Sequence, residues 1–273
     1  MMASQTQDKT LFSKRFSMRK VIRSLLPTDL QPPHQLLRRL LAGSGYFHFR
    51  TWLGAHGVPV PDRGLYQPLF SPWEGIAEFE RFYVSIQSHT LVTRDRCYIL
   101  AQTIRQAMQL PGAALECGVY RGGTALLEAM IIQECGGARQ LHLFDSFEGM
   151  PETTAGIDRF QKGDFSTTSA ERVAALLTPY PFVKLHVGFI PETFQGFDPG
   201  PIAWGHVDLD IFQAVKDAIE FIYPRLVRGG FLVFDDYGFP SCPGARLAVD
   251  QAFANRPEVP ICLPTGQCLV VKL

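Results

Sequence analysis

The chain has 273 residues, of which 46% are hydrophobic, and its formal net charge is zero. This length suits one well-packed domain with an appendage, and no apolar run approaches the ~20 residues of a membrane-spanning helix. The six cysteines form no CxxC pair, which is typical of reduced thiols in a cytosolic protein rather than of a disulfide framework. We therefore expect a cytoplasmic protein, and we expect no nucleic-acid partner.

The first 50 residues are more basic than the rest of the chain. They hold nine Lys and Arg residues against two acidic residues, Asp8 and Asp29. A basic segment of this kind could touch a membrane surface or an acidic partner, but a solvated tail is the simpler expectation. We interpret residues 1–64 as an N-terminal helical extension that is a candidate lid, and residues 65–273 as the catalytic domain.

Two amphipathic helices are expected before the first strand. Apolar residues at helical spacing predict the first between Phe79 and Ile86, and Thr93 is a suitable N-cap for the second, which Pro111–Gly112 ends. Beyond this point, the pattern predicts strand 113–118, helix 123–134, strand 140–145, helix 168–178, strands 182–187 and 202–208, helix 212–226, strand 230–235, helix 244–254 and strand 266–272. Such alternation is typical of a doubly wound, Rossmann-like α/β sheet.

The turn after the first predicted strand has the features of a cofactor site. It reads ECGVYRGG from Glu116 to Gly123, and glycines at Gly118, Gly122 and Gly123 could let the backbone approach a ligand beside the free amides of a helix start. The spacing differs from the dinucleotide pattern G-x-G-x-x-G, and the Glu116 carboxylate would repel a pyrophosphate. A cofactor that carries a positive group and hydroxyls suits this turn better.

The second strand of the alternation ends at Asp145, which Ser146 follows. From this position a carboxylate can accept hydrogen bonds from a ribose diol. Together with the acidic first turn, Asp145 favours S-adenosylmethionine over NAD as the cofactor.

Two pairs of aspartates follow two successive strands further along the chain. Asp208 and Asp210 end the first of these strands, and Asp235 and Asp236 end the second. A right-handed crossover between the strands brings both pairs to the carboxyl edge of a parallel sheet, where ligands bind. Crowded carboxylates repel one another unless a proton or a cation intervenes, so the pattern indicates a hard divalent metal. Any single aspartate of the four could instead cap a helix.

Several unlinked motifs occur in the order found in a known enzyme family. They are ECGVYRGG at 116–123, LFDSFEGMPE at 143–152, KGDF at 162–165, DLD at 208–210, YPRLVRGG at 223–230 and DDYGFPSCPGARLAVDQAF at 235–253. On these motifs the chain resembles the macrocin-type family of metal-dependent, S-adenosylmethionine-dependent sugar O-methyltransferases, which also includes aminocoumarin sugar methyltransferases. The resemblance departs at 211–215, where IFQAV replaces the polar Tyr-x-Ser-Thr run usual in the family.

The resemblance implies a class I methyltransferase domain that uses Mg²⁺. By this analogy Asp208, Asp235 and Asp236 would hold the metal, which would also bind two neighbouring oxygens of the acceptor. Asp210 would then be the general base, so that Asp208 and Asp210 are the predicted catalytic residues. The implied acceptor is a hydroxyl of a vicinal diol on a sugar or glycoside, and relatives suggest a homo-oligomer, a dimer or higher.

The predicted cofactor-binding residues are Thr90, Glu116, Gly118, Gly122, Gly123, Asp145 and Ser146. Two other readings stay open. In the first, a catechol-like phenol replaces the sugar as the acceptor, since a metal would bind any vicinal diol. In the second, the chain is a nucleotide-binding α/β protein that has the same kind of sheet but transfers no methyl group. We expect His142 and His206 to be core histidines, and Arg246 to pair with Asp250 on a helix surface or to approach the acidic cluster.

Overall fold

The structure, a computed structural model, describes Trp73 and residues 77–137 and 139–273. These residues belong to one compact unit, Pro72–Leu273. The predicted extension 1–64, its helix and its lid role lie outside the described residues. Within the described part, the helices are too short or too polar to cross a membrane.

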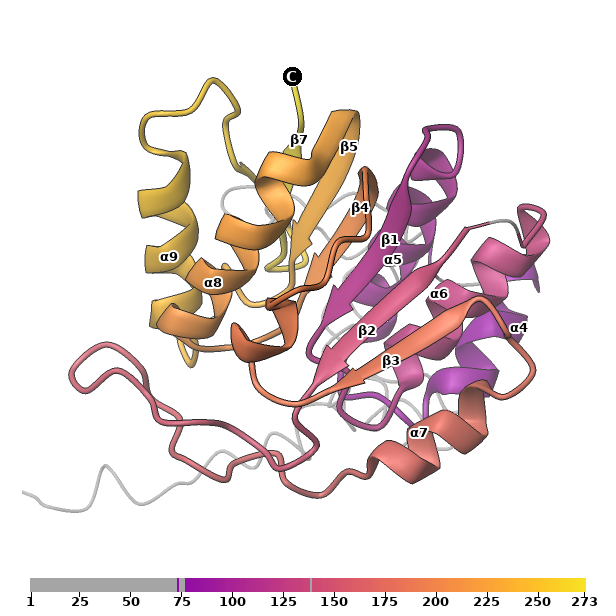
Figure 1. Cartoon of the computed structure of the whole chain (residues 1–273), viewed down its shortest axis with the longest axis horizontal. Helices are drawn as coiled ribbons and strands as arrows, with labels where there is room; N and C mark the ends of the chain where they lie inside the picture. Colours follow the sequence, from indigo (N-terminus) through magenta and orange to yellow (C-terminus); the bar gives the residue numbers. More distant parts are fainter. Residues whose placement is uncertain (1–72, 74–76, 138) are drawn as a thin grey trace, which may run out of the picture. The chain divides into compact units, whose positions relative to one another are not determined.

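A seven-stranded sheet forms the centre of the unit, in the order β3-β2-β1-β4-β5-β7-β6 (Figure 1). The strands are β1 (Ala113–Cys117), β2 (Leu141–Asp145), β3 (Val183–Val187), β4 (Ile202–Val207), β5 (Leu226–Phe234), β6 (Ile261–Cys262) and β7 (Cys268–Val271). Strands β1 to β5 pair in parallel, whereas β7 is antiparallel to both β5 and β6. The strand order reverses between β1 and β4, which is where doubly wound sheets bind ligands. The predicted doubly wound α/β sheet is confirmed.

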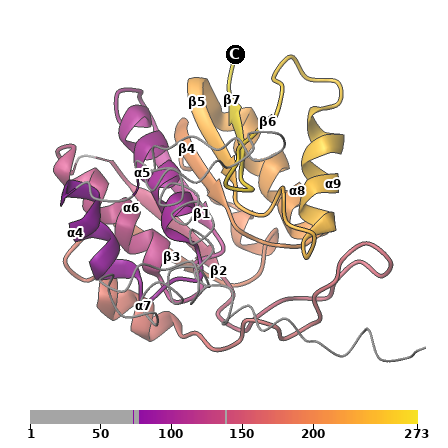
Figure 2. The same ribbon diagram turned by 180° about the vertical axis from the view of Figure 1, so that it is seen from behind.

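Helices cover both faces of this sheet (Figures 1 and 2). They are α4 (Ala77–Ile86), α5 (Arg94–Ala107), α6 (Gly123–Glu134), α7 (Ala170–Leu177), α8 (Phe212–Ile222) and α9 (Pro243–Phe253), with short 3₁₀ turns at Glu192–Phe194 and Tyr223–Arg225. One hydrophobic cluster packs α4, α5, α6 and α7 against the sheet, and a second packs α8 and α9 against its other face. The carboxyl edge of the parallel strands is left open to the loops.

The predicted order of elements is confirmed, and the differences in bounds have local causes. Helix α8 ends at Ile222 instead of 226, because Pro224 has no backbone N–H to continue it. Strand β5 begins at Leu226 instead of 230, because Leu226 already pairs with Ile202. The pairing continues beyond an irregularity at Gly229, whose φ of 79° lies in the left-handed region. The exposed two-residue strand β6 was not predicted.

Candidate active site

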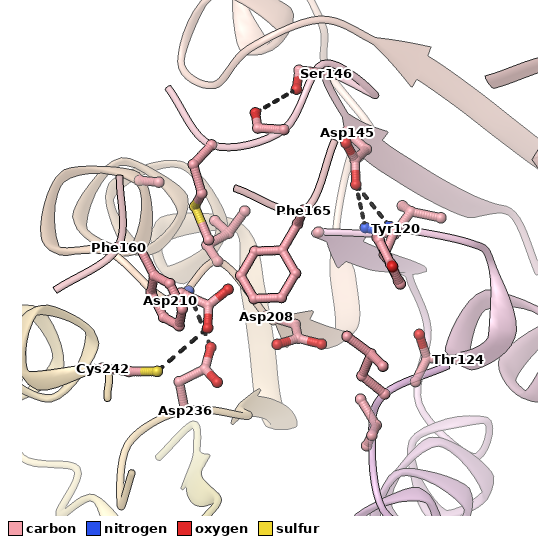
Figure 3. A pocket seen from close by; sticks show the side chains of 18 of the residues that line it. Tyr120, Thr124, Asp145, Ser146, Phe160, Phe165, Asp208, Asp210, Asp236 and Cys242 are labelled. Atoms are coloured by element: carbon pink, nitrogen blue, oxygen red, sulfur yellow. Dashed lines mark hydrogen bonds between the residues drawn. The ribbon is translucent and has the colours of Figure 1, made fainter. Parts of the chain in front are cut away.

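One pocket of about 330 Å³ lies at the carboxyl edge of the sheet (Figure 3). Its wall combines the β1–α6 turn, the end of β2, the ends of β4 and β5, and the long loop 146–169 between β2 and α7. Asp145 lies at one end and Asp208, Asp210 and Asp236 lie at the other. The fold therefore brings together acids that are far apart in the sequence, in a pocket large enough for a small molecule.

Parallel pairing of β4 and β5 places the two aspartate pairs side by side. The register ends at Val207 opposite Phe234, and the Asp235 amide continues it by donating to the Val207 carbonyl at 3.0 Å. The Asp210 amide donates to Oδ2 of Asp236 at 3.0 Å. Asp210 has a φ of 58°, a strained left-handed conformation for a non-glycine residue that is common at functional sites.

The clustered carboxylates are of like charge; Asp236 is buried, and Asp208 and Asp210 are half-buried. Burial, followed by the charges of Asp235 and Asp236, raises the pKa of Asp208 well above its usual value. Burial and the neighbouring Asp210 raise the pKa of Asp236 in the same way. Burial and the charge of Asp208 raise the pKa of Asp210 to about 7. The charge of Arg96 opposes each of these shifts without cancelling it.

A divalent cation fits this donor set. Oxygens of Asp208, Asp235 and Asp236 lie within 4.8 Å of one another, as do ligand atoms of Asp210, Asp236 and Cys242. Carboxylate oxygens are the hard ligands that Mg²⁺ and Ca²⁺ prefer. Asp208 and Asp236 line the pocket, so a cation held by them would also be accessible to a bound molecule.

Asp235 differs from the other acids because it already has protein partners. It is fully buried behind the pocket wall, where Arg96 pairs with its Oδ2 atom and the Gln267 amide donates to its Oδ1 atom at 2.8 Å. Burial works to raise the pKa of Asp235, but the neighbouring His206 and the Arg96 guanidinium outweigh it and hold the pKa below its usual value. Of the three predicted metal ligands, Asp235 is thus the one held by outer partners.

Arg96 and Gln267 were not among the predicted site residues. Arg96 lies in the first turn of α5, where the helix dipole disfavours a positive charge unless an acid lies nearby. An arginine at this position therefore indicates a nearby acidic partner. Gln267 is buried just before β7, and only the antiparallel return of that strand brings it to Asp235.

Glu116 occupies a different place from the one predicted. Its side chain is fully buried beneath the β1–α6 turn, 3.2 Å from Nδ1 of His206, and Glu128 lies 3.4 Å from the same nitrogen. His206 also approaches Asp235, with 3.6 Å between Nε2 and Oδ1. The predicted core position of His206 is confirmed, and that of His142 is too, since it is 5% exposed. Glu116 therefore faces the core and not the pocket.

Asp145 lines the pocket as predicted, and backbone amides hold its carboxylate. Oδ2 accepts hydrogen bonds from the amides of Val119 at 2.7 Å and Tyr120 at 2.8 Å (Figure 3), and Oδ1 accepts one from the amide of Phe147 at 2.7 Å. These contacts fix the carboxylate beside the β1–α6 turn. Amides take both acceptor sites of Oδ2, and Oδ1 keeps one site for a ligand hydroxyl, so the carboxylate can bind one hydroxyl of a ribose diol.

The predicted glycines serve mainly to pack protein against protein. A Cβ at Gly118, where φ is 91°, would collide with the carbonyl of Asp208, so this glycine lets the β1 turn touch the end of β4. A Cβ at Gly123 would lie 2.6 Å from Cβ of Thr90, and Gly122 faces Val173 of α7. Gly118 and Thr90 line the pocket, as does Ser146; Gly122 and Gly123 lie behind them.

Several pocket residues come from positions to which the sequence assigned no role. Phe160 and Phe165 of the loop 146–169 line the wall, with ring centroids 5.2 Å apart. Phe165 also packs edge-on to Tyr120 at 6.1 Å. Cys242 donates from Sγ to Oδ1 of Asp210 at 3.3 Å, and Figure 3 shows it beside Asp210 and Asp236. Phe165 and Cys242 lie within motifs that carried the family resemblance, which was the available signal.

Two minor predictions are also answered. Arg246 pairs with Asp250 on the surface of α9, with 3.5 Å between Nε and Oδ2, and so does not join the acidic cluster. All six cysteines lie in the described part and are free thiols.

A family model described as macrocin-O-methyltransferase (TylF) matches residues 84–261 of the chain. One curated relative is 8-demethyl-8-(2,3-dimethoxy-alpha-L-rhamnosyl)-tetracenomycin-C 4'-O-methyltransferase of Streptomyces olivaceus, 31% identical over 172 residues, which are 58% of this chain and 66% of the relative. A second is mycinamicin III 3''-O-methyltransferase of Micromonospora griseorubida, 28% identical over 171 residues, 57% of this chain and 67% of the relative. The matched region thus spans about two thirds of each relative.

Solved structures support the same fold. The O-methyltransferase NovP superposes with a TM-score of 0.62 at 24% identity, covering 67% of this chain and 82% of that one. CalS11, the calicheamicin methyltransferase, superposes with a TM-score of 0.58 at 20% identity, covering 77% and 99%. The predicted class I methyltransferase sheet is therefore confirmed.

Proposed function

The chain belongs to the macrocin O-methyltransferase family, and on that premise we propose that it methylates a hydroxyl of a vicinal diol on a sugar-containing metabolite. S-adenosylmethionine, the methyl donor that the family implies, supplies the methyl group from a sulfonium. One observation carries the proposal. One pocket has Asp145, a carboxylate placed to accept a hydrogen bond from a ribose hydroxyl, at one end. At its other end lie the acids Asp208, Asp210 and Asp236.

The Asp145 end suits the nucleoside part of the donor. The carboxylate of Asp145, positioned by three amides, would accept a hydrogen bond from one ribose hydroxyl at Oδ1. Thr124, buried at the start of α6, lines the same wall, and Met150 and Ile190 offer apolar surface to a flat base. Family membership argues against the alternative of a nucleotide-binding protein that transfers no methyl group.

The acidic end suits a divalent cation, for which we propose Mg²⁺. Asp208 and Asp236 would hold it from the pocket side. Asp235, fixed by Arg96 and Gln267, would complete the set from behind, because ligating carboxylates are themselves held by hydrogen bonds. When bound, the cation lowers the pKa of a coordinated hydroxyl and orients it.

Asp210 is the proposed general base. Its carboxylate lines the pocket, its backbone is held by Asp236, and its pKa of about 7 suits proton transfer near neutral pH. Asp210 would accept the proton of the acceptor hydroxyl while that oxygen bonds to the methyl carbon and the carbon–sulfur bond breaks. The products are the methyl ether and S-adenosylhomocysteine.

The acceptor class rests on the relatives. The tetracenomycin relative is named for methylation of a rhamnosyl group, and the mycinamicin relative for a 3''-hydroxyl, so we place this chain in sugar O-methylation of natural products. A catechol-like phenol is the second candidate, because Phe160 and Phe165 give the pocket wall an aromatic character. We assign the activity to residues 65–273, with 1–64 as an N-terminal extension.

Binding of the reaction product tests the proposal directly. Thermal unfolding is measured with S-adenosylhomocysteine and with NAD, each at ~100 times a micromolar dissociation constant. We expect S-adenosylhomocysteine to stabilise the protein by ~2–3 kcal/mol and NAD to leave the melting temperature unchanged. Stabilisation by NAD alone would instead identify a dinucleotide-binding protein.

A further inference from the structure

The loop 146–169 is attached to the starts of α8 and α9, the helices that follow the two aspartate pairs. It leaves the end of β2, passes the ends of α8 and α9 in both views, and returns to α7 (Figures 1 and 2). On the way it contributes Phe160 and Phe165 to the pocket wall. The position of these two rings therefore depends on what holds the loop against α8 and α9.

Helix α8 begins shortly after Asp210, and helix α9 begins after the loop that runs from Asp236 to Cys242. Helix α8 starts at Phe212, and its N-cap residue is Ile211, an apolar side chain that cannot accept a hydrogen bond. Helix α9 starts at Pro243, and its N-cap residue, Cys242, directs its Sγ to Asp210. The first amides of a helix need acceptors from elsewhere when the N-cap side chain supplies none.

Asp158 supplies such an acceptor from the loop. Its Oδ1 accepts a hydrogen bond from the Phe212 amide at 2.9 Å, and its Oδ2 accepts one from Thr154 within the loop at 2.7 Å. A Cβ at Gly244 would collide with the same Oδ1 atom. The carboxylate thus occupies a slot between α8 and α9 that stays open because residue 244 is glycine.

We propose that Asp158 is a positioning residue for acceptor recognition: by capping α8 from the loop, it sets Phe160 and Phe165 in the pocket wall beside Asp210. This inference rests on the proposed function for the identity of the acceptor. The contact itself spans 54 residues of sequence and joins the loop to the segment immediately after the proposed base. Losing it frees the aromatic wall, while the donor end stays in place: Asp145 is held by the β1–α6 turn, and Met150 keeps its backbone hydrogen bonds to Gly163 and Asp164.

Trypsin sensitivity reports on the loop independently of activity. Arg159 and Lys162 flank Phe160 and are natural cleavage sites in the loop. The folded protein is treated with trypsin under native conditions, and mass spectrometry monitors cleavage after these two residues. In Asp158→Ala we expect this cleavage to be ~5-fold faster than in the wild type, the factor that corresponds to losing one helix cap. The matched control is Asp164→Ala, which removes a carboxylate bonded only to Gln161 of the same loop and should leave the cleavage rate near that of the wild type.

Kinetics complete the test. We expect Asp158→Ala to raise the KM of the acceptor ~5-fold, with less than a twofold change in the dissociation constant of S-adenosylhomocysteine. Gly244→Ala should reproduce both effects from the helix side, and should cost less in the Asp158→Ala background, where the slot is empty. If Asp158→Ala melts too low to assay, Asp158→Asn replaces it, with a smaller effect of the same direction.

Cleavage and KM that match the wild type in every variant would overturn the inference and leave Asp158 as a cap alone. An equal loss of affinity for S-adenosylhomocysteine would also overturn it, because the effect would not be confined to the acceptor wall. If the wild type transferred no methyl group, the proposed function would fail, while the proteolysis result would still decide the role of Asp158.

Discussion

The side-chain amide of Gln267 donates a hydrogen bond of 2.8 Å to Oδ1 of the fully buried Asp235. Arg96 binds the other oxygen of that carboxylate, so an acid at the heart of the cluster is oriented by two residues outside it. The pair links the start of β7 to the end of β5. Arg96 also lines the pocket, whereas Gln267 is not among its lining residues, so the acidic cluster depends on one partner at the pocket wall and one behind it.

The Gln267–Asp235 bond can be removed without changing the charge of the site. In Gln267→Leu we expect the affinity for Mg²⁺ to fall by ~10–100-fold, the usual cost of losing a hydrogen bond behind a metal ligand. Isothermal titration calorimetry or Mn²⁺ competition measures it. Gln213→Leu on the exposed face of α8, where the amide bonds only Asp217, is the control. Equal affinities for Mg²⁺ in Gln267→Leu and Gln213→Leu would show that Asp235 is not a ligand of the metal.

Asp145 should govern binding of the donor through the ribose diol. We expect Asp145→Ala to weaken the binding of S-adenosylhomocysteine at least ~10-fold, because a hydrogen bond to a charged carboxylate is lost. The loss should shrink for the 2'-deoxy analogue, which separates the diol from loosening of the β1–α6 turn. An identical loss for both ligands would assign Asp145 a purely structural role.

The rate should follow the ionisation of Asp210. A base works only when deprotonated, and the pKa of Asp210 is about 7, so kcat/KM should rise with pH and level off above neutrality. A cation held at Asp208 and Asp236 stabilises the carboxylate and would move the midpoint below 7. The pH profile of Asp210→Asn should lack this limb. A limb retained in the variant would belong to another group.

The same raised pKa makes a prediction for stability in the absence of metal. The unfolded chain releases the Asp210 proton near its ordinary pKa of ~3.9, below the folded value of about 7. Stability is therefore lost as pH rises between these two values. Asp210→Asn removes this loss, and Asn tolerates the left-handed backbone. With metal removed by a chelator, we expect Asp210→Asn to have a higher melting temperature than the wild type at pH 8 but not at pH 4. A higher melting temperature only at low pH would contradict the predicted direction of the pH dependence.

The sheet could be predicted because its signal is local. Short strand segments that alternate with helical patterns between residues 113 and 254 need no knowledge of distant partners, and the acids at 145, 208 and 236 reach the pocket by topology alone. Glu116 shows the limit. A strand-end acid can face the core or the ligand, and its direction depends on His206 and Glu128, which approach it only in the folded state.

Long-range partners could not be predicted for the same reason. Arg96 and Asp235 are 139 residues apart, and neither local pattern names the other. In the sequence, Asp158 is one of several acids in a polar loop. Its role becomes visible only in the fold, where it lies beside Gly244 and the start of α8. Sequence motifs marked the regions around these residues, but the contacts that give them roles come from folding.

Transfer of a labelled methyl group tests the central claim most directly. Wild type and Asp210→Asn are incubated with methyl-labelled S-adenosylmethionine, Mg²⁺ and a rhamnosyl glycoside or a catechol, and the products are followed by mass spectrometry. We predict transfer to one hydroxyl of the sugar diol, its loss after exhaustive chelation with recovery on adding Mg²⁺, and a rate ~10²-fold lower in Asp210→Asn. Undiminished transfer by chelated enzyme, or an Asp210→Asn rate equal to the wild type, would contradict the account.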